Sequence, residues 1–396
     1  MPPRLARRVA GFGTTIFSEM SRLAAEHHAV NLGQGFPDFD GPEPVKAAAI
    51  AAIEAGQNQY ALSMGQPALR QAIAAHAARF YGQSVDPETE ITVTSGATET
   101  LFAAIQGLVD PGDEVIILEP FYDAYVPDVL MAGGVPRLVP CRPPAWTFDP
   151  AELAAAFNAR TRLILVNTPH NPTGRVLDAA ELGVIAALCQ QWDVVAVSDE
   201  VYEHLVYDGV RHVRLATLPG MAARTVTVSS LGKTFSFTGW KIGWGLAPPA
   251  LTSALRRAHQ WITFATSTPM QAAAAVALGL DDEFYRSFAD EFQARRDFLV
   301  QALRDAGLRV SVPQGTYFVL ADFSELDHPA LRGADDTTFC RWLTTDVGVA
   351  AIPPSAFFSE AHRGIPRQWA RFAFCKRQAT LERAAERLRH LHQHRR

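Results

Sequence analysis

Five short runs of apolar and β-branched residues alternate with helical patterns, and this alternation constrains the fold more than any other feature. The runs span residues 91–94, 114–118, 162–166, 194–197 and 225–228. Strands separated by helices form mostly parallel sheets, because each crossover helix returns the chain to the same edge. The pattern therefore predicts an α/β fold with a doubly wound, mostly parallel sheet. Ligands of such sheets bind beyond the carboxyl ends of the strands.

After Pro248 the pattern becomes mainly helical and predicts a different architecture. A long amphipathic helix is expected over residues 289–306, followed by a short hairpin that turns at Pro313-Gln314-Gly315 between the runs 309–312 and 317–320. A chain of 396 residues also exceeds one compact core. We therefore expect an N-terminal segment that joins the smaller domain, a large domain and a small α+β domain, over residues 1–40, 41–284 and 285–396.

The composition argues against several classes of protein. The formal net charge is −5, and no basic block appears before the last few residues, so a nucleic-acid partner is not expected. The alanine-rich runs, such as 272–280, are much shorter than the ~20 residues that a membrane span requires. The N-terminus carries no continuous apolar stretch of the kind found in signal peptides. We expect a cytoplasmic protein without a membrane partner.

The four cysteines are scattered along the chain and form no CxxC pair. They are Cys141, Cys189, Cys340 and Cys375. This spacing indicates neither a disulfide framework nor a zinc site, and no metal is expected.

Residues suited to an anion and to a flat ring follow the first two predicted strands. Gly96, Ala97 and Thr98 form a tight turn that leads into a helix, where free backbone N–H groups can hold a phosphate. Tyr122 follows the second strand, and its ring is suited either to stacking on a flat cofactor or to packing in the core.

Polar residues follow the third and fourth strands. Asn171 precedes a proline, which restricts its backbone and fixes the direction of its amide. Its neighbour His170 is expected to be a positioned loop residue rather than a general base. Asp199 ends an apolar strand, where a carboxylate is costly without a cationic partner, and Tyr202 follows it. A pyridinium nitrogen would supply such a partner.

A lysine follows the fifth strand. Lys233 comes just after the run 225–228, where desolvation favours a neutral amine and lowers its pKa. A neutral amine is a nucleophile that forms a Schiff base with an aldehyde. Ser230 and Lys241 are suited to an anionic phosphate beside it. Together the five strand ends suggest pyridoxal phosphate as the cofactor.

In this order, the motifs resemble those of pyridoxal-phosphate-dependent aminotransferases of fold type I, class I and II. The segment Asn31-Leu32-Gly33-Gln34-Gly35-Phe36-Pro37-Asp38-Phe39 is similar to the N-terminal signature of the kynurenine–glutamine and methionine aminotransferase branch. The resemblance extends from about residue 17 to about residue 381. It implies a large pyridoxal-phosphate-binding domain and an N-terminal segment at the rim of the active site.

The resemblance also implies roles for the residues around the cofactor ring. Lys233 matches the Schiff-base lysine, which also carries the substrate proton. Asp199 matches the partner of the pyridine nitrogen, and it would keep that nitrogen protonated. Tyr202 and Asn171 match the residues that hydrogen-bond the ring hydroxyl, and Tyr122 occupies the stacking position.

The phosphate and the substrate have matching positions as well. The resemblance assigns the phosphate to the turn at Gly96, Ala97 and Thr98, to Ser230 and Lys241, and to Tyr60 of the neighbouring subunit, which implies a homodimer with shared active sites. Many members have arginine where this chain has Lys241. The substrate carboxylate is assigned to Arg371, Asn167 and Gly35, and Phe17 to a wall of the side-chain pocket. A bidentate arginine fork suits a carboxylate better than a lysine does.

The function that the resemblance implies is transamination. The enzyme would move the α-amino group of an L-amino acid of methionine, kynurenine, aromatic or glutamine type to a 2-oxo acid by ping-pong chemistry. No second substrate arginine is evident, although the sequence does not place Arg256, Arg257 and Arg295. A C–S β-lyase acting on cysteine conjugates and a diaminopimelate-pathway aminotransferase are the alternatives.

Overall fold

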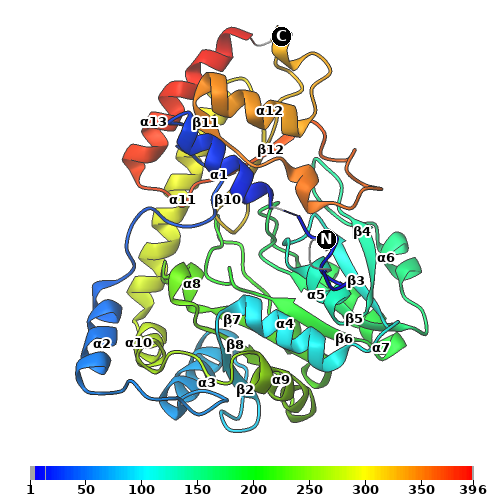
Figure 1. The fold of residues 1–396 in the computed structure, drawn as a ribbon, viewed down its shortest axis with the longest axis vertical. Coiled ribbons are helices and arrows are strands. Elements are labelled where there is room, and N and C mark those ends of the chain that lie inside the picture. Colours follow the sequence, from blue (N-terminus) through cyan, green and yellow to red (C-terminus); the bar gives the residue numbers. More distant parts are fainter. Residues whose placement is uncertain (1–4, 14, 395–396) are drawn as a thin grey trace.

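A seven-stranded sheet forms the centre of the lower part of the molecule in a computed structural model, which describes residues 5–13 and 15–394 (Figure 1). The strand order is β2-β8-β7-β6-β5-β3-β4, and only β8 runs antiparallel to its neighbours. The doubly wound, mostly parallel α/β fold is therefore confirmed. The strands are β2 (Ile91–Thr94), β3 (Glu114–Glu119), β4 (Val135–Pro140), β5 (Thr161–Asn167), β6 (Val195–Asp199), β7 (Thr225–Ser230) and β8 (Gly243–Leu246).

Helices cover both faces of this sheet. In β5, Leu163 and Leu165 pack toward one face, and Ile164 and Val166 pack toward the other. Successive strand residues point to opposite faces, so a strand covered on both sides is apolar throughout. The first face is covered by α4 (Ala97–Leu108), α5 (Tyr125–Met131) and α9 (Pro249–Ile262), and the second by α6 (Pro150–Ala156) and α7 (Ala179–Trp192).

Three further helices close the sheet where β2 and β8 meet. They are α2 (Glu43–Glu54), α3 (Pro67–Tyr81) and α10 (Thr268–Leu278), and they share an apolar core with Ile91 and Val93 of β2 and with Trp244 and Leu246 of β8. The short helix α8 (Leu231–Thr234) directly follows β7.

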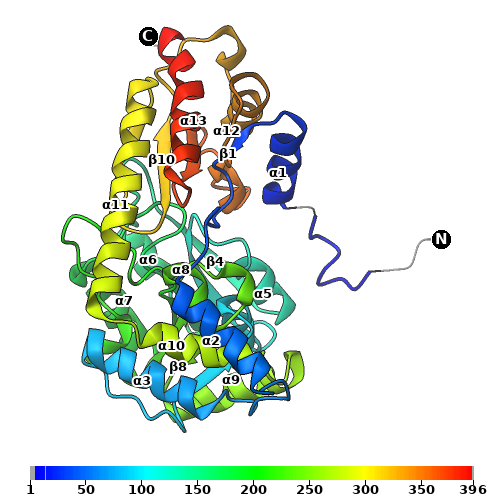
Figure 2. The same cartoon turned by 90° about the vertical axis from the view of Figure 1, so that its left-hand side faces the viewer.

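A three-stranded antiparallel sheet lies above the large one in Figure 1, with β10 between β9 and β12. The helices α11 and α13 lie side by side along it (Figure 2). A parallel pair, β1 with β11, joins the N-terminal segment to this region. The elements are α1 (Ile16–Glu26), β1 (Val30–Asn31), α11 (Asp282–Asp305), β9 (Arg309–Ser311), β10 (Phe318–Asp322), α12 (Asp336–Trp342), β11 (Val349–Ala350), β12 (Trp369–Ala373) and α13 (Gln378–Leu388).

Short 3₁₀ segments and one π-helical turn complete the secondary structure. The 3₁₀ segments are Leu215–Thr217, Ala222–Arg224, Thr238–Trp240, Pro329–Leu331, Pro354–Phe357 and Arg389–His394, and the π-helical turn is Leu343–Val347. The predicted domain boundary between residues 284 and 285 falls inside α11, and the division into domains stays a prediction.

Two strands of the large sheet escape prediction from the sequence for physical reasons. β4 is an edge strand that contains Pro136 and Pro140, and proline is tolerated mainly at sheet edges. β8 contains two glycines, which weaken any strand pattern. A Cβ on Gly243 would lie 2.4 Å from the Ala97 nitrogen, so glycine is required there for α4 to approach the sheet closely.

The predicted hairpin is correct in its pairing and wrong in its turn. β9 and β10 are antiparallel, but their pairing starts only at Ser311 and Leu320. The connection is therefore longer than the expected Pro-Gln-Gly turn. Gln314 and Gly315 instead donate backbone hydrogen bonds to the Gly174 carbonyl in the large-sheet region, at 2.8 and 2.9 Å.

Two of the expectations drawn from the sequence concern the state of the cysteines and membrane-spanning helices. All four cysteines are buried and free. Within residues 5–13 and 15–394, no helix combines the length and the apolar character that crossing a membrane requires.

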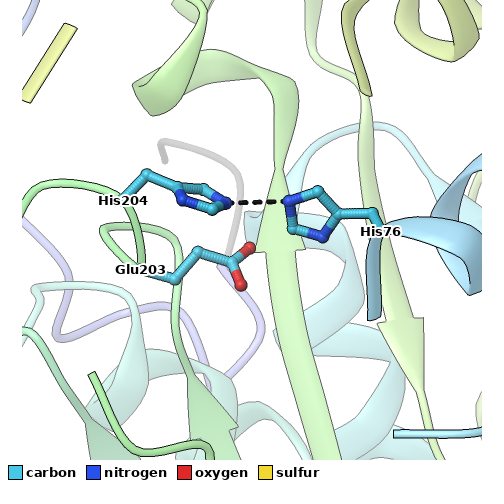
Figure 3. Close-up of side chains that lie close together, drawn as sticks. All are labelled: His76, Glu203 and His204. Atoms are coloured by element: carbon cyan, nitrogen blue, oxygen red, sulfur yellow. Dashed lines mark hydrogen bonds between the residues drawn. The ribbon is translucent and has the colours of Figure 1, made fainter. Parts of the chain in front are cut away.

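A buried polar cluster braces the turn that follows β6. His76 of α3 faces Glu203 and His204 of this turn, and the two imidazole Nε2 atoms lie 2.8 Å apart (Figure 3). Burial lowers the pKa of His76 to about 4 and that of His204 to about 3, so both are neutral near pH 7. Glu203 accepts hydrogen bonds from Ser229 at 2.6 Å and from Arg214 at 2.5 Å. The potential metal ligands of this cluster therefore already have partners inside the protein.

Arg214 is the cation on which this cluster depends. Its guanidinium contacts Glu203 and, at 3.1 Å, Glu200, and both carboxylates are buried. It also lies 3.8 Å from the ring centroid of Tyr81. Two buried carboxylates thus share one cationic partner.

Arg214→Leu should lower the free energy of unfolding by about 3–5 kcal/mol, because it leaves buried carboxylates without a cation. Arg22→Leu is the matched control: its pair with Glu26 is exposed and should contribute less than about 0.5 kcal/mol. Urea denaturation of both variants measures the difference. Equal losses in the two variants would contradict the importance assigned to Arg214.

Candidate active site

A cavity of about 420 Å³ opens at the carboxyl edge of the large sheet. Residues that follow five of its strands line the cavity, together with residues of the upper region. The cavity contains every site residue predicted from the sequence except Tyr60: Phe17, Gly35, Gly96, Ala97, Thr98, Tyr122, Asn167, Asn171, Asp199, Tyr202, Ser230, Lys233, Lys241 and Arg371.

Lys233 lies in α8, at the end of β7, and its half-buried side chain faces the cavity. Burial lowers the pKa of its amine to about 8, although the nearby Asp199 carboxylate acts in the opposite direction. Its Nζ donates a hydrogen bond to the Tyr317 hydroxyl at 3.0 Å. A lysine with this pKa has a substantial neutral fraction near neutral pH and can act as a nucleophile.

Asp199 is the last residue of β6 and is buried. Its Oδ2 accepts a hydrogen bond from the Tyr125 hydroxyl at 2.7 Å, and its Oδ1 accepts one from the Val201 nitrogen at 3.4 Å. Burial nevertheless raises the pKa of its carboxyl to about 6. This carboxylate would be stabilised by a cationic N–H group placed in the cavity.

Arg371 comes from β12 and is buried. Its Nη1 donates to the Asn171 Oδ1 at 3.2 Å and its Nη2 donates to the Gly33 carbonyl at 2.8 Å. Its buried Nε has no hydrogen-bond partner among the residues that the structure describes, and burial lowers the pKa of the guanidinium to about 10. A donor that is buried and unsatisfied is suited to bind an anionic ligand such as a carboxylate.

Two asparagines hold the loop beneath this guanidinium. Asn167 donates from Nδ2 to the Asp199 carbonyl at 2.8 Å, and its Oδ1 accepts from the Asn171 nitrogen at 2.7 Å. The loop is thus tied to the end of β6, and Asn171 is held where it contacts Arg371.

An anion cradle forms where β2 leads into α4. Gly96 has a φ of +83°, which favours glycine, and none of the described side chains caps the helix that begins at Ala97. A Cβ on Gly96 would lie 3.2 Å from the Nζ of Lys241, so the ammonium group lies against this turn. Helix N–H groups with a cation beside them attract an anion such as a phosphate. Ser230 lines the same cavity.

Apolar groups shape the remaining walls. Tyr122 lies edge-on to Tyr125, with ring centroids 5.7 Å apart. The Phe17 ring lies 5.2 Å from the Arg371 guanidinium carbon. A Cβ on Gly35 would lie 2.5 Å from the ring of Phe318, so only glycine fits between this segment and β10.

Tyr60 lies outside the cavity of its own chain. Its side chain is 87% exposed and packs edge-on against Phe264, with centroids 5.6 Å apart. Other exposed apolar residues are Leu62 near Tyr60, Trp261 in the last turn of α9 and Phe264 in the loop that follows α9. The role predicted for Tyr60 requires a second subunit and stays a prediction.

Three of the polar residues that sequence reasoning missed interact with predicted site residues or line the cavity beside them. Tyr125 and Asp123 belong to the motif that contains Tyr122, and their positions beside it were the available signal. Tyr317 precedes β10, and the sequence pattern around it predicts only a strand over residues 317–320. No local signal indicated its contact with Lys233, because the two residues are 84 positions apart.

Three arginines and one histidine that the sequence analysis named without a site role lie outside the cavity lining. None of Arg256, Arg257 and Arg295 lines the cavity. His170 is buried, and its Nε2 donates to the Pro120 carbonyl at 2.9 Å while its Nδ1 pairs with the Thr173 hydroxyl at 2.8 Å. Burial lowers its pKa to about 4. These contacts agree with the expectation of a positioned loop residue.

Comparison with known proteins identifies the family. The family model for class I and II aminotransferases matches residues 27–388. A kynurenine–oxoglutarate transaminase of Dictyostelium discoideum is 41% identical over 414 residues, covering 97% of this chain and 95% of the relative. A probable N-succinyldiaminopimelate aminotransferase of Mycobacterium tuberculosis is 47% identical over 390 residues, covering 96% and 97%.

A solved structure gives the same result for the fold. The crystal structure of an Escherichia coli protein identified as having methionine aminotransferase function superposes with a TM-score of 0.93 at 42% identity, covering 98% of this chain and 100% of that one. The chain therefore belongs to the family of class I and II aminotransferases and is a pyridoxal-phosphate-dependent transaminase of fold type I.

Proposed function

We propose that this transaminase takes its amino group from a neutral L-amino acid of methionine, kynurenine, aromatic or glutamine type and passes it to a 2-oxo acid. One observation carries the proposal: three groups with pKa values shifted toward the neutral form lie in one cavity. They are the Lys233 amine, the Asp199 carboxylate and the Arg371 guanidinium. Each of them is disfavoured there without a ligand.

The residues of the cavity fit pyridoxal phosphate. When bound, this cofactor supplies an electron-accepting ring that stabilises negative charge on the substrate α-carbon. Asp199 would pair with the ring nitrogen, since none of the described residues forms an ion pair with its buried carboxylate. Tyr122 would pack on the ring, and Tyr202 and Asn171 would bind its hydroxyl. The phosphate would lie at Gly96, Ala97, Thr98, Ser230 and Lys241, where the uncapped start of α4 and an ammonium group meet.

Lys233 would hold the cofactor and move the substrate proton. Its amine must be neutral for both tasks, and burial lowers its pKa to about 8. After the substrate amine replaces Lys233 on the cofactor, the freed Lys233 amine takes the substrate α-proton. It then delivers this proton to the cofactor carbon to which Lys233 had been attached. The same side chain thus serves first as a nucleophile and then as a base and an acid.

Arg371 would bind the substrate α-carboxylate. Its unpartnered Nε supports this role, as do Asn171 and the Gly33 carbonyl, which fix the plane of the guanidinium. Asn167 and Gly35 would form the rest of this subsite, and Phe17 one wall. With the carboxylate fixed, the α-carbon is oriented toward Lys233.

The walls of the cavity favour a neutral substrate side chain. Among the described residues that line it, the cations are Lys233, Lys241 and Arg371, and the proposal already uses all three. Asp123 adds a negative charge to the same wall. A side-chain carboxylate would therefore lack a cationic partner among the described residues that line the cavity.

Two alternatives use the same cavity. A C–S β-lyase would share every residue above and would differ only in a leaving group on the substrate. A diaminopimelate-pathway aminotransferase is favoured by the 47% identity to the probable N-succinyldiaminopimelate aminotransferase. Its acidic substrate is disfavoured by the cations available in the cavity.

Titration of the holoenzyme with amino donors tests the proposal. Methionine, kynurenine, phenylalanine and glutamine should bleach its visible absorbance, and a 2-oxo acid should restore it. Aspartate and N-succinyldiaminopimelate should react at least about tenfold less efficiently, because one unpaired charge costs more than about 1.4 kcal/mol. A preference for either acidic donor would contradict the proposal, and release of pyruvate and ammonia from a cysteine conjugate without bleaching would favour the lyase.

Attachment of the cofactor to the apo-protein should depend on the protonation of Lys233. Below about pH 8 the rate should fall roughly tenfold per pH unit, because only the neutral amine reacts. Stopped-flow absorbance after mixing with pyridoxal phosphate measures this rate. Lys233→Ala should neither attach the cofactor nor turn over, whereas Lys46→Ala, at a lysine paired with Asp40 and Glu43, is the control. A flat rate between pH 6 and 9 would contradict the role of Lys233.

We also propose a cytoplasmic homodimer with shared active sites. The exposed Tyr60 and Phe264 pair supports it, because exposed aromatic residues favour an interface. The four free cysteines are in keeping with a reducing compartment.

Mixed dimers of Tyr60→Ala and Lys233→Ala test the shared site. If Tyr60 serves the neighbouring subunit, each mixed dimer has one intact site, and random mixing should restore about a quarter of the wild-type activity. Unfolding and refolding the two inactive variants together, followed by an assay, measures this. Refolding each variant alone is the control, and no gain on mixing would rule out the shared site.

A further inference from the structure

Tyr317 is the residue of the cavity region whose contacts the proposed function leaves unexplained. Its side chain is fully buried, and its hydroxyl is the hydrogen-bond partner of the Lys233 amine. We propose that Tyr317 is a positioning residue: it holds the free amine of Lys233 in the orientation from which this amine accepts the substrate α-proton. The inference rests on the role proposed for Lys233.

The backbone around Tyr317 is fixed on both sides. Thr316 has a φ of +64°, and its nitrogen donates to the Leu205 carbonyl at 2.9 Å. The Phe318 nitrogen donates to the Thr316 hydroxyl at 3.1 Å, and the Phe374 nitrogen donates to the Tyr317 carbonyl at 2.9 Å. A non-glycine residue with positive φ persists only where its surroundings enforce it. The backbone that carries the Tyr317 side chain is therefore held rigidly in place.

Aromatic packing fixes the ring as well. The Tyr202 ring meets that of Tyr317 edge-on, with centroids 5.2 Å apart, and Phe318 packs at 4.8 Å. The Lys233 Nζ lies 5.6 Å from the ring centroids of both tyrosines. The hydroxyl thus occupies one defined position beside the amine.

The direction of the hydrogen bonds defines what the hydroxyl does. Tyr317 donates its proton to the Gly35 carbonyl at 2.6 Å, because a carbonyl can only accept. Its lone pairs remain for Lys233, which must donate an N–H to them at 3.0 Å. An amine that donates to Tyr317 keeps its own lone pair directed elsewhere, available for a proton.

Tyr317 does not compete for that proton. Burial raises the pKa of its phenol well above the ordinary value, so the hydroxyl stays neutral across the working pH range. Removing the hydroxyl therefore removes the acceptor for Lys233 and the donor to the Gly35 carbonyl, but no acid or base. Because a hydrogen-bond acceptor stabilises the ammonium form more than the neutral amine, its loss should make Lys233 easier to deprotonate.

The experiment compares Tyr317→Phe with Tyr285→Phe. The first variant deletes one oxygen and keeps the ring, so the packing with Tyr202 and Phe318 is retained. Tyr285 is the matched control, since it is also buried, lies in another apolar cluster and donates to the Leu278 carbonyl at 3.3 Å. Thermal denaturation first establishes that both variants are folded.

The apo-protein supplies a measurement that does not require turnover. In Tyr317→Phe, the midpoint of the pH dependence of cofactor attachment should move down by about one pH unit. In Tyr285→Phe it should stay at the wild-type value. An unchanged midpoint in Tyr317→Phe would overturn the proposal. This measurement remains valid if the wild-type enzyme fails the donor titration, so failure of the proposed function and of this inference are distinguishable.

The holoenzyme supplies the second measurement. With a neutral donor, kcat of Tyr317→Phe should fall about 10- to 100-fold with KM changed less than about threefold, because the amine is misplaced while the substrate still binds. The isotope effect of an α-deuterated donor should rise, since proton transfer then limits the rate. A rise in KM at unchanged kcat would assign Tyr317 to the substrate-binding segment at Gly35 and would overturn the positioning role.

Discussion

Exclusion of water from the charged groups of the cavity is the constraint on which the rest of the structure depends. Lys233, Asp199 and Arg371 all have pKa values displaced toward the neutral form, and burial is the largest cause in each case. Functional groups keep a defined geometry best when rigid helices and strands hold them. Asp199 ends β6, Lys233 lies just beyond the end of β7, and Arg371 lies within β12, so a hydrogen-bonded ladder fixes the backbone at or next to each of them.

The support for these groups is itself braced by buried charge. Glu203, which directly follows Tyr202, accepts a hydrogen bond from Ser229, which directly precedes Ser230. The Arg214 guanidinium pairs with the same Glu203 carboxylate. The turn after β6 and the end of β7 are therefore tied together one residue away from the cavity. Close packing matters in β8 as well, because Gly243 lets the start of α4 approach the sheet and form the anion cradle. Sites on rigid elements keep the geometry that catalysis requires.

Much of this site was predictable from the sequence because the chemistry lies in local motifs. The apolar runs have a period and composition that indicate strands, and all five are present. The residues after them line one cavity, since parallel strands deliver their carboxyl ends to one edge. Their assignment to roles also needed the resemblance to the family. The strands β4 and β8 were missed, because proline and glycine conceal a strand that only its neighbours stabilise.

The sequence by itself determined the fold class, the cofactor and the order of the motifs, since each depends on residues that are close along the chain. Only the tertiary structure decided which distant residues meet. The bond from Tyr317 to Gly35 joins positions 282 apart, and that from Arg371 to Gly33 joins positions 338 apart. Such contacts depend on how the N-terminal segment that follows β1 packs against the upper sheet, and no local period encodes that packing. The exposure of Tyr60 likewise became evident only when its surroundings were in place, because burial is a property of the folded chain and not of a residue.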